Sequence, residues 1–119
     1  MIGMNDLVLS YRSIVTTIPI SVPSQLMDLH EEQKLVAAAQ QSADGFGKLY
    51  DCYFGRVYGF VASKVNDRGD AEDLTSEIFM KVLENINSFE WRGIPFGGWL
   101  FKIARNTLNS YYATHAKSS

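Results

Sequence analysis

The spacing of apolar residues from Asp28 onward is the feature that most limits how this 119-residue chain can fold. Apolar side chains recur at steps of three and four residues, the spacing that places them on one face of an α-helix. The clearest stripe consists of Phe46, Leu49, Tyr50, Tyr53, Val57, Phe60, Val61 and Val65. No segment keeps the two-residue alternation of a half-buried strand, and the sequence contains no internal repeat. The pattern therefore predicts an all-α fold.

We expect a compact bundle of about four helices preceded by an irregular N-terminal arm. The helices are predicted at residues 29–41, 44–65, 70–86 and 98–112. Asp28 is suited to cap the first helix and Asp70 the third, because an aspartate carboxylate can accept hydrogen bonds from the free N–H groups of a first turn. A chain of this length can form one domain with a modest core, but not two well-buried ones.

Residues 28–112 are expected to form the functional domain. Residues 1–27 are assigned to the arm, because two prolines interrupt its β-branched and apolar stretch, and residues 113–119 to a C-terminal tail or the start of a linker. The arm contains no apolar run long enough to span a membrane, and its basic residues are too few for a good secretion signal. We therefore expect a cytoplasmic protein without membrane insertion.

Charge is unevenly divided along the chain. Residues 1–80 contain six basic and eleven acidic side chains, a net charge of −5, whereas residues 81–119 contain five basic and two acidic ones, a net charge of +3. An acidic half and a basic half suggest two partners of opposite character. A chance division within a small domain is the alternative interpretation.

The residue pattern does not favour an enzyme or a metalloprotein. The single Cys52 can form no disulfide within the chain and is expected to be a small core residue. The only histidines, His30 and His115, lie at no ligand spacing from a cysteine or carboxylate cluster. No nucleophile lies beside a general base, and no phosphate-binding glycine motif precedes a helix. The sequence thus predicts no catalytic residue, no metal site and no cofactor.

The last predicted helix and the loop before it carry residues that suit single-stranded nucleic acid. One side of the helix is polar and not acidic, with Lys102, Arg105, Asn106 and Asn109. Cations can neutralise phosphates, and amides can bond to base edges. The loop at residues 87–98 places Phe89, Trp91 and Phe96 beside Arg92, and aromatic rings with adjacent cations hold unstacked bases. A solvated helix face and rings packed into the core are the alternatives.

The third predicted helix is acidic on its outer side. Asp73 and Glu77 stand one turn apart, with Met80 and Leu83 nearby. This strip of acidic and apolar side chains would suit a basic helix of a protein partner. An ordinary solvated helix face would have a similar composition.

Residues 30–112 resemble region 2, the core-binding and promoter-melting region, of the extracytoplasmic-function (group 4) sigma factors of the sigma-70 family. The matching motifs are Phe46 with Leu49-Tyr50, Asp70-Ala71-Glu72-Asp73-Leu74-Thr75 with Glu77-Ile78-Phe79, Ser88-Phe89, and Trp99-Leu100 with Ile103-Ala104-Arg105-Asn106. The resemblance implies a helical domain that docks on the RNA polymerase core. It also implies that the domain captures the melted non-template strand of the promoter minus-ten element during bacterial transcription initiation, without catalysing a reaction itself.

The resemblance also implies roles for individual residues. Those that would contact the clamp helices of the polymerase beta-prime subunit are Asp73, Ser76, Glu77, Phe79 and Leu83. Phe89 and Asn106 fall where a flipped base is captured, and Trp99 falls at the upstream edge of the melted segment. Phosphate contacts are expected from Arg92, Lys102 and Arg105. The residue pattern adds Trp91 and Asn109 to the predicted DNA-binding set.

The chain departs from the family pattern at three places. Ser76 stands where the family usually has glutamine, which would shorten one polar contact with polymerase. After Tyr112 the family commonly continues with arginines, whereas residues 113–117 here are nearly neutral, which should weaken duplex binding. A second helical domain that reads the minus-thirty-five element is not encoded after Tyr112. We therefore expect either an excised domain or a single-domain variant.

Two further expectations concern partners. Sigma factors of this group are often held inactive by an anti-sigma factor, and the resemblance predicts such a partner here. The alternative function is a diverged helical interaction module that binds polymerase or a regulator through the acidic helix and does not bind DNA. Substitution of Phe89, Trp99 or Asn106 would leave the activity of such a module intact.

Overall fold

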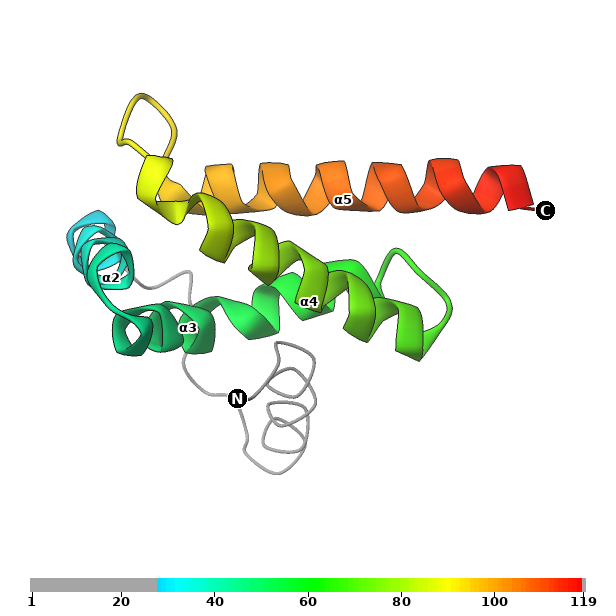
Figure 1. The fold of residues 1–119 in the computed structure, drawn as a ribbon, viewed down its shortest axis with the longest axis horizontal. Helices are drawn as coiled ribbons and strands as arrows, with labels where there is room; N and C mark the ends of the chain where they lie inside the picture. The colour runs from blue at the N-terminus through cyan, green and yellow to red at the C-terminus, as the bar shows by residue number, and fades with distance from the viewer. Residues whose placement is uncertain (1–27, 119) are drawn as a thin grey trace.

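A computed structural model describes residues 28–118 of the chain, and in this part it contains four α-helices, one short 3₁₀ helix and no strand (Figure 1). The elements are α2 (Leu29–Gln41), α3 (Ala43–Ala62), α4 (Arg68–Asn85), the 3₁₀ helix η2 (Ile86–Ser88) and α5 (Phe96–Ser118). The predicted all-α bundle is confirmed. The arm expected at residues 1–27 lies outside the described residues.

Helices α2 and α3 form a closely packed corner. Asp28 caps α2 as predicted, since its Oδ1 accepts a hydrogen bond of 2.8 Å from the backbone N of Glu31. Ser42 separates the two helices, and its hydroxyl accepts a bond of 2.9 Å from the backbone N of Gly45. A Cβ on Gly45 would lie only 2.1 Å from the carbonyl oxygen of Ala38. Glycine is therefore required for the two backbones to approach this closely.

The cap of α4 corrects one prediction. Asp67, rather than Asp70, precedes the helix in an extended conformation, and its Oδ1 accepts a bond of 2.9 Å from the backbone N of Asp70. Helix α4 consequently begins at Arg68. Asp70 lies in the first turn, where its Oδ2 accepts a bond of 2.7 Å from the hydroxyl of Tyr111 on α5.

The core lies between the inner faces of all four helices. Its buried aromatic and aliphatic members include Tyr53, Val57, Ile78, Phe79, Val82, Phe96, Leu100 and Ala104. The apolar stripe predicted on α3 largely lies in this core, although Phe60 and Val65 are only partly buried. The expectation that Cys52 is a core residue is wrong, because this position falls outside the buried stripe of α3 and the side chain is exposed.

Helix α5 begins two residues earlier and ends later than predicted, so residues 113–118, assigned to a tail or linker, continue the helix. Phe96 is fully buried, which anchors the first turn despite the two glycines that follow it. A Cβ on Gly98 would lie 2.6 Å from Cγ2 of Ile94, so glycine lets the loop pass close to this turn. Figure 1 shows α5 lying across α4, with the loop between η2 and α5 at the same end of the bundle as α2. No helix within residues 28–118 has the length and apolar character needed to cross a membrane.

Candidate nucleic-acid and protein interfaces

Four aromatic rings cluster where the loop enters α5. Phe89 lies at the centre, with ring centroids 4.9 Å from Trp91, 5.4 Å from Phe96 and 5.2 Å from Trp99. Phe89 is only 7% exposed and Phe96 is fully buried, whereas Trp91 is 37% exposed and Trp99 is partly buried at the edge of the core. The cluster therefore has a buried base, formed by the two phenylalanines, and two tryptophans at the surface.

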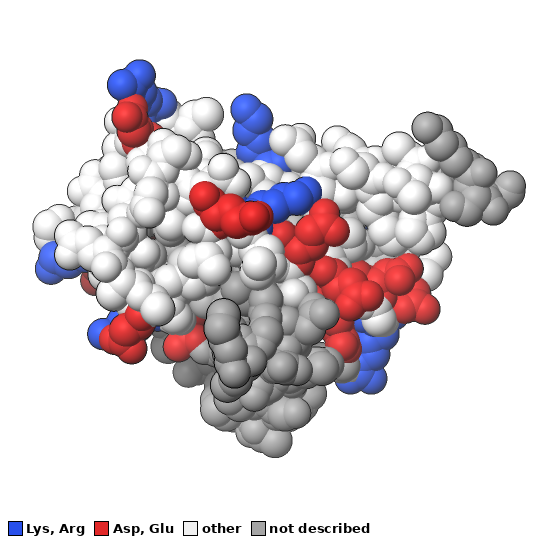
Figure 2. All heavy atoms as spheres, in the orientation of Figure 1, with Lys and Arg blue, Asp and Glu red and all other residues white. Residues whose placement is uncertain are grey.

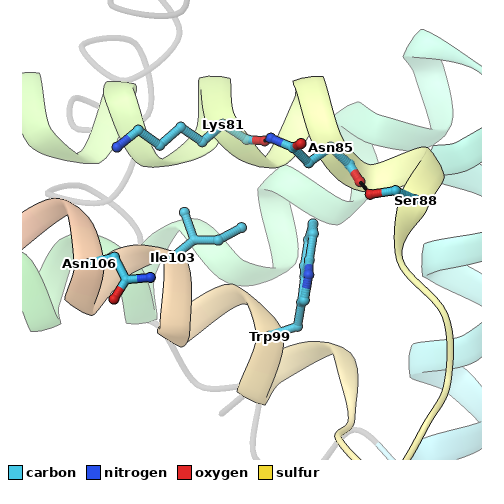
Figure 3. Close-up of a pocket in the computed structure, with 6 residues that line it drawn as sticks. All are labelled: Lys81, Asn85, Ser88, Trp99, Ile103 and Asn106. Carbon is cyan, nitrogen blue, oxygen red and sulfur yellow. Dashed lines mark hydrogen bonds between the residues drawn. The ribbon is translucent and has the colours of Figure 1, made fainter.

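An open pocket of about 340 Å³ lies beside this cluster, between α4, η2 and α5 (Figure 3). Its lining residues are Lys81, Asn85, Ser88, Trp99, Ile103 and Asn106. In Figure 3 the indole ring of Trp99 stands as one wall, Ile103 lies between the two helices, and Asn106 lies further along α5. The volume is at the lower end of the range for small-molecule sites, roughly 300–1,000 Å³.

The polar groups of the pocket include one lysine ammonium and two asparagine amides. The Nζ of Lys81 donates a hydrogen bond of 3.1 Å to Oγ1 of Thr107 and pairs with Oε2 of Glu77 at 3.1 Å. Asn85 donates from Nδ2 to the carbonyl oxygen of Lys81 at 2.8 Å. Asn106 is exposed and makes no hydrogen bond with another described side chain. The pocket thus combines an aromatic face, an available amide and a cation, the groups that stack on, bond to and neutralise a nucleotide.

Three lining residues of α4 and η2 were not identified from the sequence. Lys81, Asn85 and Ser88 follow one another at steps of four and three residues, so they share one side of the chain as it leaves α4. The same steps relate Trp99, Ile103 and Asn106 on α5, a pattern that matches the first. The matching spacing of these two sets of residues could have indicated the pocket from the sequence. Only the packing of α4 on α5 shows that the two sets face each other.

The structure distributes the predicted DNA-binding residues over three environments. Trp99 and Asn106 line the pocket, and the buried Phe89 supports it from below. Trp91 and Arg92 lie on the exposed loop, where Nε of Arg92 pairs with Oε2 of Glu90 at 2.6 Å. The remaining three, Lys102, Arg105 and Asn109, are exposed on α5 outside the pocket lining, and neither cation forms an ion pair with a described carboxylate.

The outer side of α4 is acidic, as Figure 2 shows for the face in view. The helix contains five carboxylates and two cations, and both cations pair with carboxylates one turn away. Asp73 and Glu77 are exposed beside the exposed apolar side chains of Met80 and Leu83. We name these four residues the α4 strip. It has the acidic and apolar character expected for contact with a basic helix.

Two other residues predicted to contact polymerase are buried. Ser76 is 6% exposed and Phe79 is 1% exposed. The Phe79 ring packs against Tyr50 of α3, with ring centroids 4.6 Å apart. Direct contact with a partner would require both side chains to move, so the α4 strip does not include them.

Side-chain hydrogen bonds at Thr107 and Tyr111 join α5 to α4. Thr107, 1% exposed, accepts from Lys81 and donates to the carbonyl oxygen of Ile103 at 2.8 Å. Nearer the C-terminus, the bond from Tyr111 to Asp70 raises the pKa of the Tyr111 hydroxyl to about 12, because the carboxylate accepts its proton as a hydrogen bond. These bonds join α5, which carries one side of the pocket, to α4, which carries the strip.

No group of three or more histidine, cysteine, aspartate or glutamate side chains among the described residues is placed to hold a metal ion. The described residues form an acidic helix face and a separate aromatic pocket with two amides and one cation. They define a helical binding domain with two unlike surfaces. The sigma-70 region 2 family model matches residues 49–118, and the chain belongs to this family.

The chain is also similar to individual sigma factors. The chain is 43% identical over 98 residues to the ECF RNA polymerase sigma factor BldN of Streptomyces coelicolor, a match that covers 82% of this chain and 36% of that protein. It is 36% identical over 70 residues to the ECF RNA polymerase sigma factor SigM of Bacillus subtilis, covering 59% of this chain and 42% of that protein. The chain therefore spans less than half the length of these relatives. No solved structure matches it significantly. The family resemblance inferred from the motifs is confirmed.

Proposed function

We propose that this chain acts as region 2 of an extracytoplasmic-function sigma factor in bacterial transcription initiation. In this role it docks on the RNA polymerase core through the α4 strip and captures the melted non-template strand of a promoter minus-ten element. The observation that carries the proposal is the pocket between α4 and α5, where Trp99 and Asn106 stand on one helix and Lys81 on the other. The sigma-factor relatives support the same conclusion.

The pocket offers what an unstacked base requires. A base flipped out of the duplex costs a few kcal/mol to expose. Stacking on an aromatic ring returns about 1–3 kcal/mol per base, and bonds to a base edge add discrimination. A base lying against the indole of Trp99 would have the amides of Asn85 and Asn106 within the same pocket. Lys102 and Arg105, which have no described ion-pair partner, would neutralise phosphates along α5.

The α4 strip is the proposed polymerase contact. Its two carboxylates and two apolar side chains are exposed together, which suits a basic amphipathic helix such as the beta-prime clamp helices. We further propose that the protein is cytoplasmic and not an enzyme, and that an anti-sigma factor controls it by covering the strip or the pocket.

Binding of single-stranded DNA tests the nucleic-acid half of the proposal. The only two tryptophans of the chain are Trp91 on the loop and Trp99 in the pocket wall, so tryptophan fluorescence reports on both places without an added label. We expect a selected single-stranded oligonucleotide to quench this fluorescence. Asn106→Ala should weaken binding about tenfold, the effect of losing one good contact to a base edge. Asn66→Ala, an exposed asparagine in the turn before α4, is the matched control and should leave binding unchanged.

Binding of a beta-prime clamp-helix fragment tests the polymerase half. Asp73→Ala and Glu77→Ala should each weaken it, more at low salt than at moderate salt, because exposed charges are screened. Asp51→Ala on α3 is the control for loss of one exposed carboxylate. Clamp binding without any DNA binding would instead support the interaction module that does not bind DNA.

A further inference from the structure

Gln40, on the last turn of α2, makes a contact that the proposed function does not use. Its Nε2 donates hydrogen bonds to the carbonyl oxygens of Ile86, at 2.8 Å, and Phe89, at 3.3 Å. These partners are 46 and 49 residues away in sequence. One amide thus spans η2 from its first residue to the residue just after it, where the chain enters the aromatic loop.

The segment that Gln40 holds has few hydrogen bonds of its own. Between η2 and α5 the described backbone bonds are those from the N of Phe89 to the O of Ile86, at 3.1 Å, and from the N of Arg92 to the O of Glu90, at 2.9 Å. A carbonyl oxygen has two lone pairs, so that of Ile86 can accept a side-chain donor beside the N of Phe89, and that of Phe89 accepts from neither of these backbone N–H groups. Gln40 supplies such donors, so its amide contributes directly to where the backbone of Phe89 lies.

Glu32 on α2 lies near the other end of the loop. The carboxylate of Glu32 accepts a hydrogen bond from the hydroxyl of Tyr53 on α3. A Cβ on Gly97, in the first turn of α5, would lie 3.6 Å from Oε2 of Glu32. A negative charge is favourable beside a helix N-terminus. The loop is therefore bonded to α2 at its entry, through Gln40, and the carboxylate of Glu32 lies near its exit.

We propose that Gln40 is a positioning residue for base capture, and this inference rests on the proposed function of the pocket. By fixing the backbone at Phe89, Gln40 fixes the buried ring on which Trp91 and Trp99 pack, and so sets the shape of the wall against which a base stacks. The family resemblance assigns no contact to helix α2. In this proposal α2 does not touch DNA, but it positions the loop residues that do.

The test replaces Gln40 in two ways in the full chain. Gln40→Met keeps the length of the side chain and a good helix former but removes the donors. Gln40→Lys restores a donor. Gln33→Met and Gln33→Lys, at an exposed glutamine on the same helix, control for the substitution and for the added charge. Thermal unfolding followed by circular dichroism establishes that each variant is folded. Gln40→Asn, which shortens the reach by one methylene, serves in place of Gln40→Met if that variant does not fold.

Three measurements are compared. We expect Gln40→Met to bind the selected single-stranded oligonucleotide about five- to tenfold more weakly, because both hydrogen bonds of the Gln40 amide to the loop are lost, while clamp-fragment binding stays within about twofold. Neutral acrylamide should quench the tryptophans of free Gln40→Met more than those of wild type. Gln40→Lys, corrected by Gln33→Lys, should restore both DNA binding and protection from acrylamide.

Two results would overturn the inference: oligonucleotide binding and quenching unchanged in Gln40→Met, or equal losses of DNA and clamp binding that Gln40→Lys does not restore. Failure of the wild type to bind any single-stranded DNA would refute the proposed function and, with it, the role of Gln40 in base capture. Acrylamide quenching would then still show whether Gln40 orders the loop, so the two failures are distinguishable.

Discussion

Replacement of Gly45 by alanine should separate α2 from α3. The added Cβ would lie 2.1 Å from the carbonyl oxygen and 2.4 Å from the carbonyl carbon of Ala38, both backbone atoms that no side-chain rotation can move. Gly59 provides the matched control, because it lies in the same helix and a Cβ there would meet nothing within 4 Å.

The two substitutions should change stability in opposite directions. Alanine in place of a glycine within a helix stabilises the folded protein by about 0.5–1 kcal/mol, because alanine loses less backbone entropy than glycine when the chain folds. The free energy of unfolding of Gly59→Ala should rise by this amount. In Gly45→Ala the overlap exceeds an ångström, and forced overpacking costs about 1–3 kcal/mol or more. Subtracting the gain from this cost, we expect a net loss of about 1–2 kcal/mol, which lowers the melting temperature by roughly 5–15 °C in a domain of this size.

Thermal and urea unfolding, followed by circular dichroism, measure both effects. Because Gln40 lies two residues after Ala38, the shift in Gly45→Ala should also move the amide that holds the loop, and oligonucleotide binding should weaken even where the variant remains folded. A Gly45→Ala variant as stable as Gly59→Ala would refute the close crossing of α2 and α3. A destabilised Gly59→Ala would show that the outer side of α3 is covered.

Two further predictions concern pH and salt. The hydrogen bond to Asp70 raises the pKa of Tyr111 to about 12. The stability that this bond contributes should therefore be complete below about pH 10 and be lost as the pH rises toward 12. A Tyr111→Phe variant, whose thermal unfolding is measured across the same range, should not show this loss. Arg105→Gln should reduce the salt slope of oligonucleotide binding by about 0.7, the value for one phosphate contact on a single strand. Arg92→Gln should change the slope less, because Glu90 already pairs with Arg92, and equal slopes for the two variants would contradict this assignment.

Most of the helical architecture could be predicted, because a helix that packs on a core has apolar residues at steps of three and four in its own sequence. The bounds of α2, its Asp28 cap and the buried stripe of α3 all depend on residues within one or two turns of each other. The side of α5 that carries Asn106 follows from the same period. Where two local signals competed, as for Asp67 and Asp70 at the start of α4, pattern alone selected the wrong carboxylate.

The candidate site depended on contacts that the period of a helix does not encode. Aromatic composition marked the loop, but only packing decided that Phe89 lies beneath the surface while Trp99 forms the pocket wall. Lys81 and Asn106 likewise line the same pocket only because α4 packs against α5. The bond from Gln40 to Ile86 joins residues 46 apart. The sequence by itself determined which faces the helices have, because that property is local; the tertiary structure decided which faces meet, because burial is shared between segments that are distant in the chain.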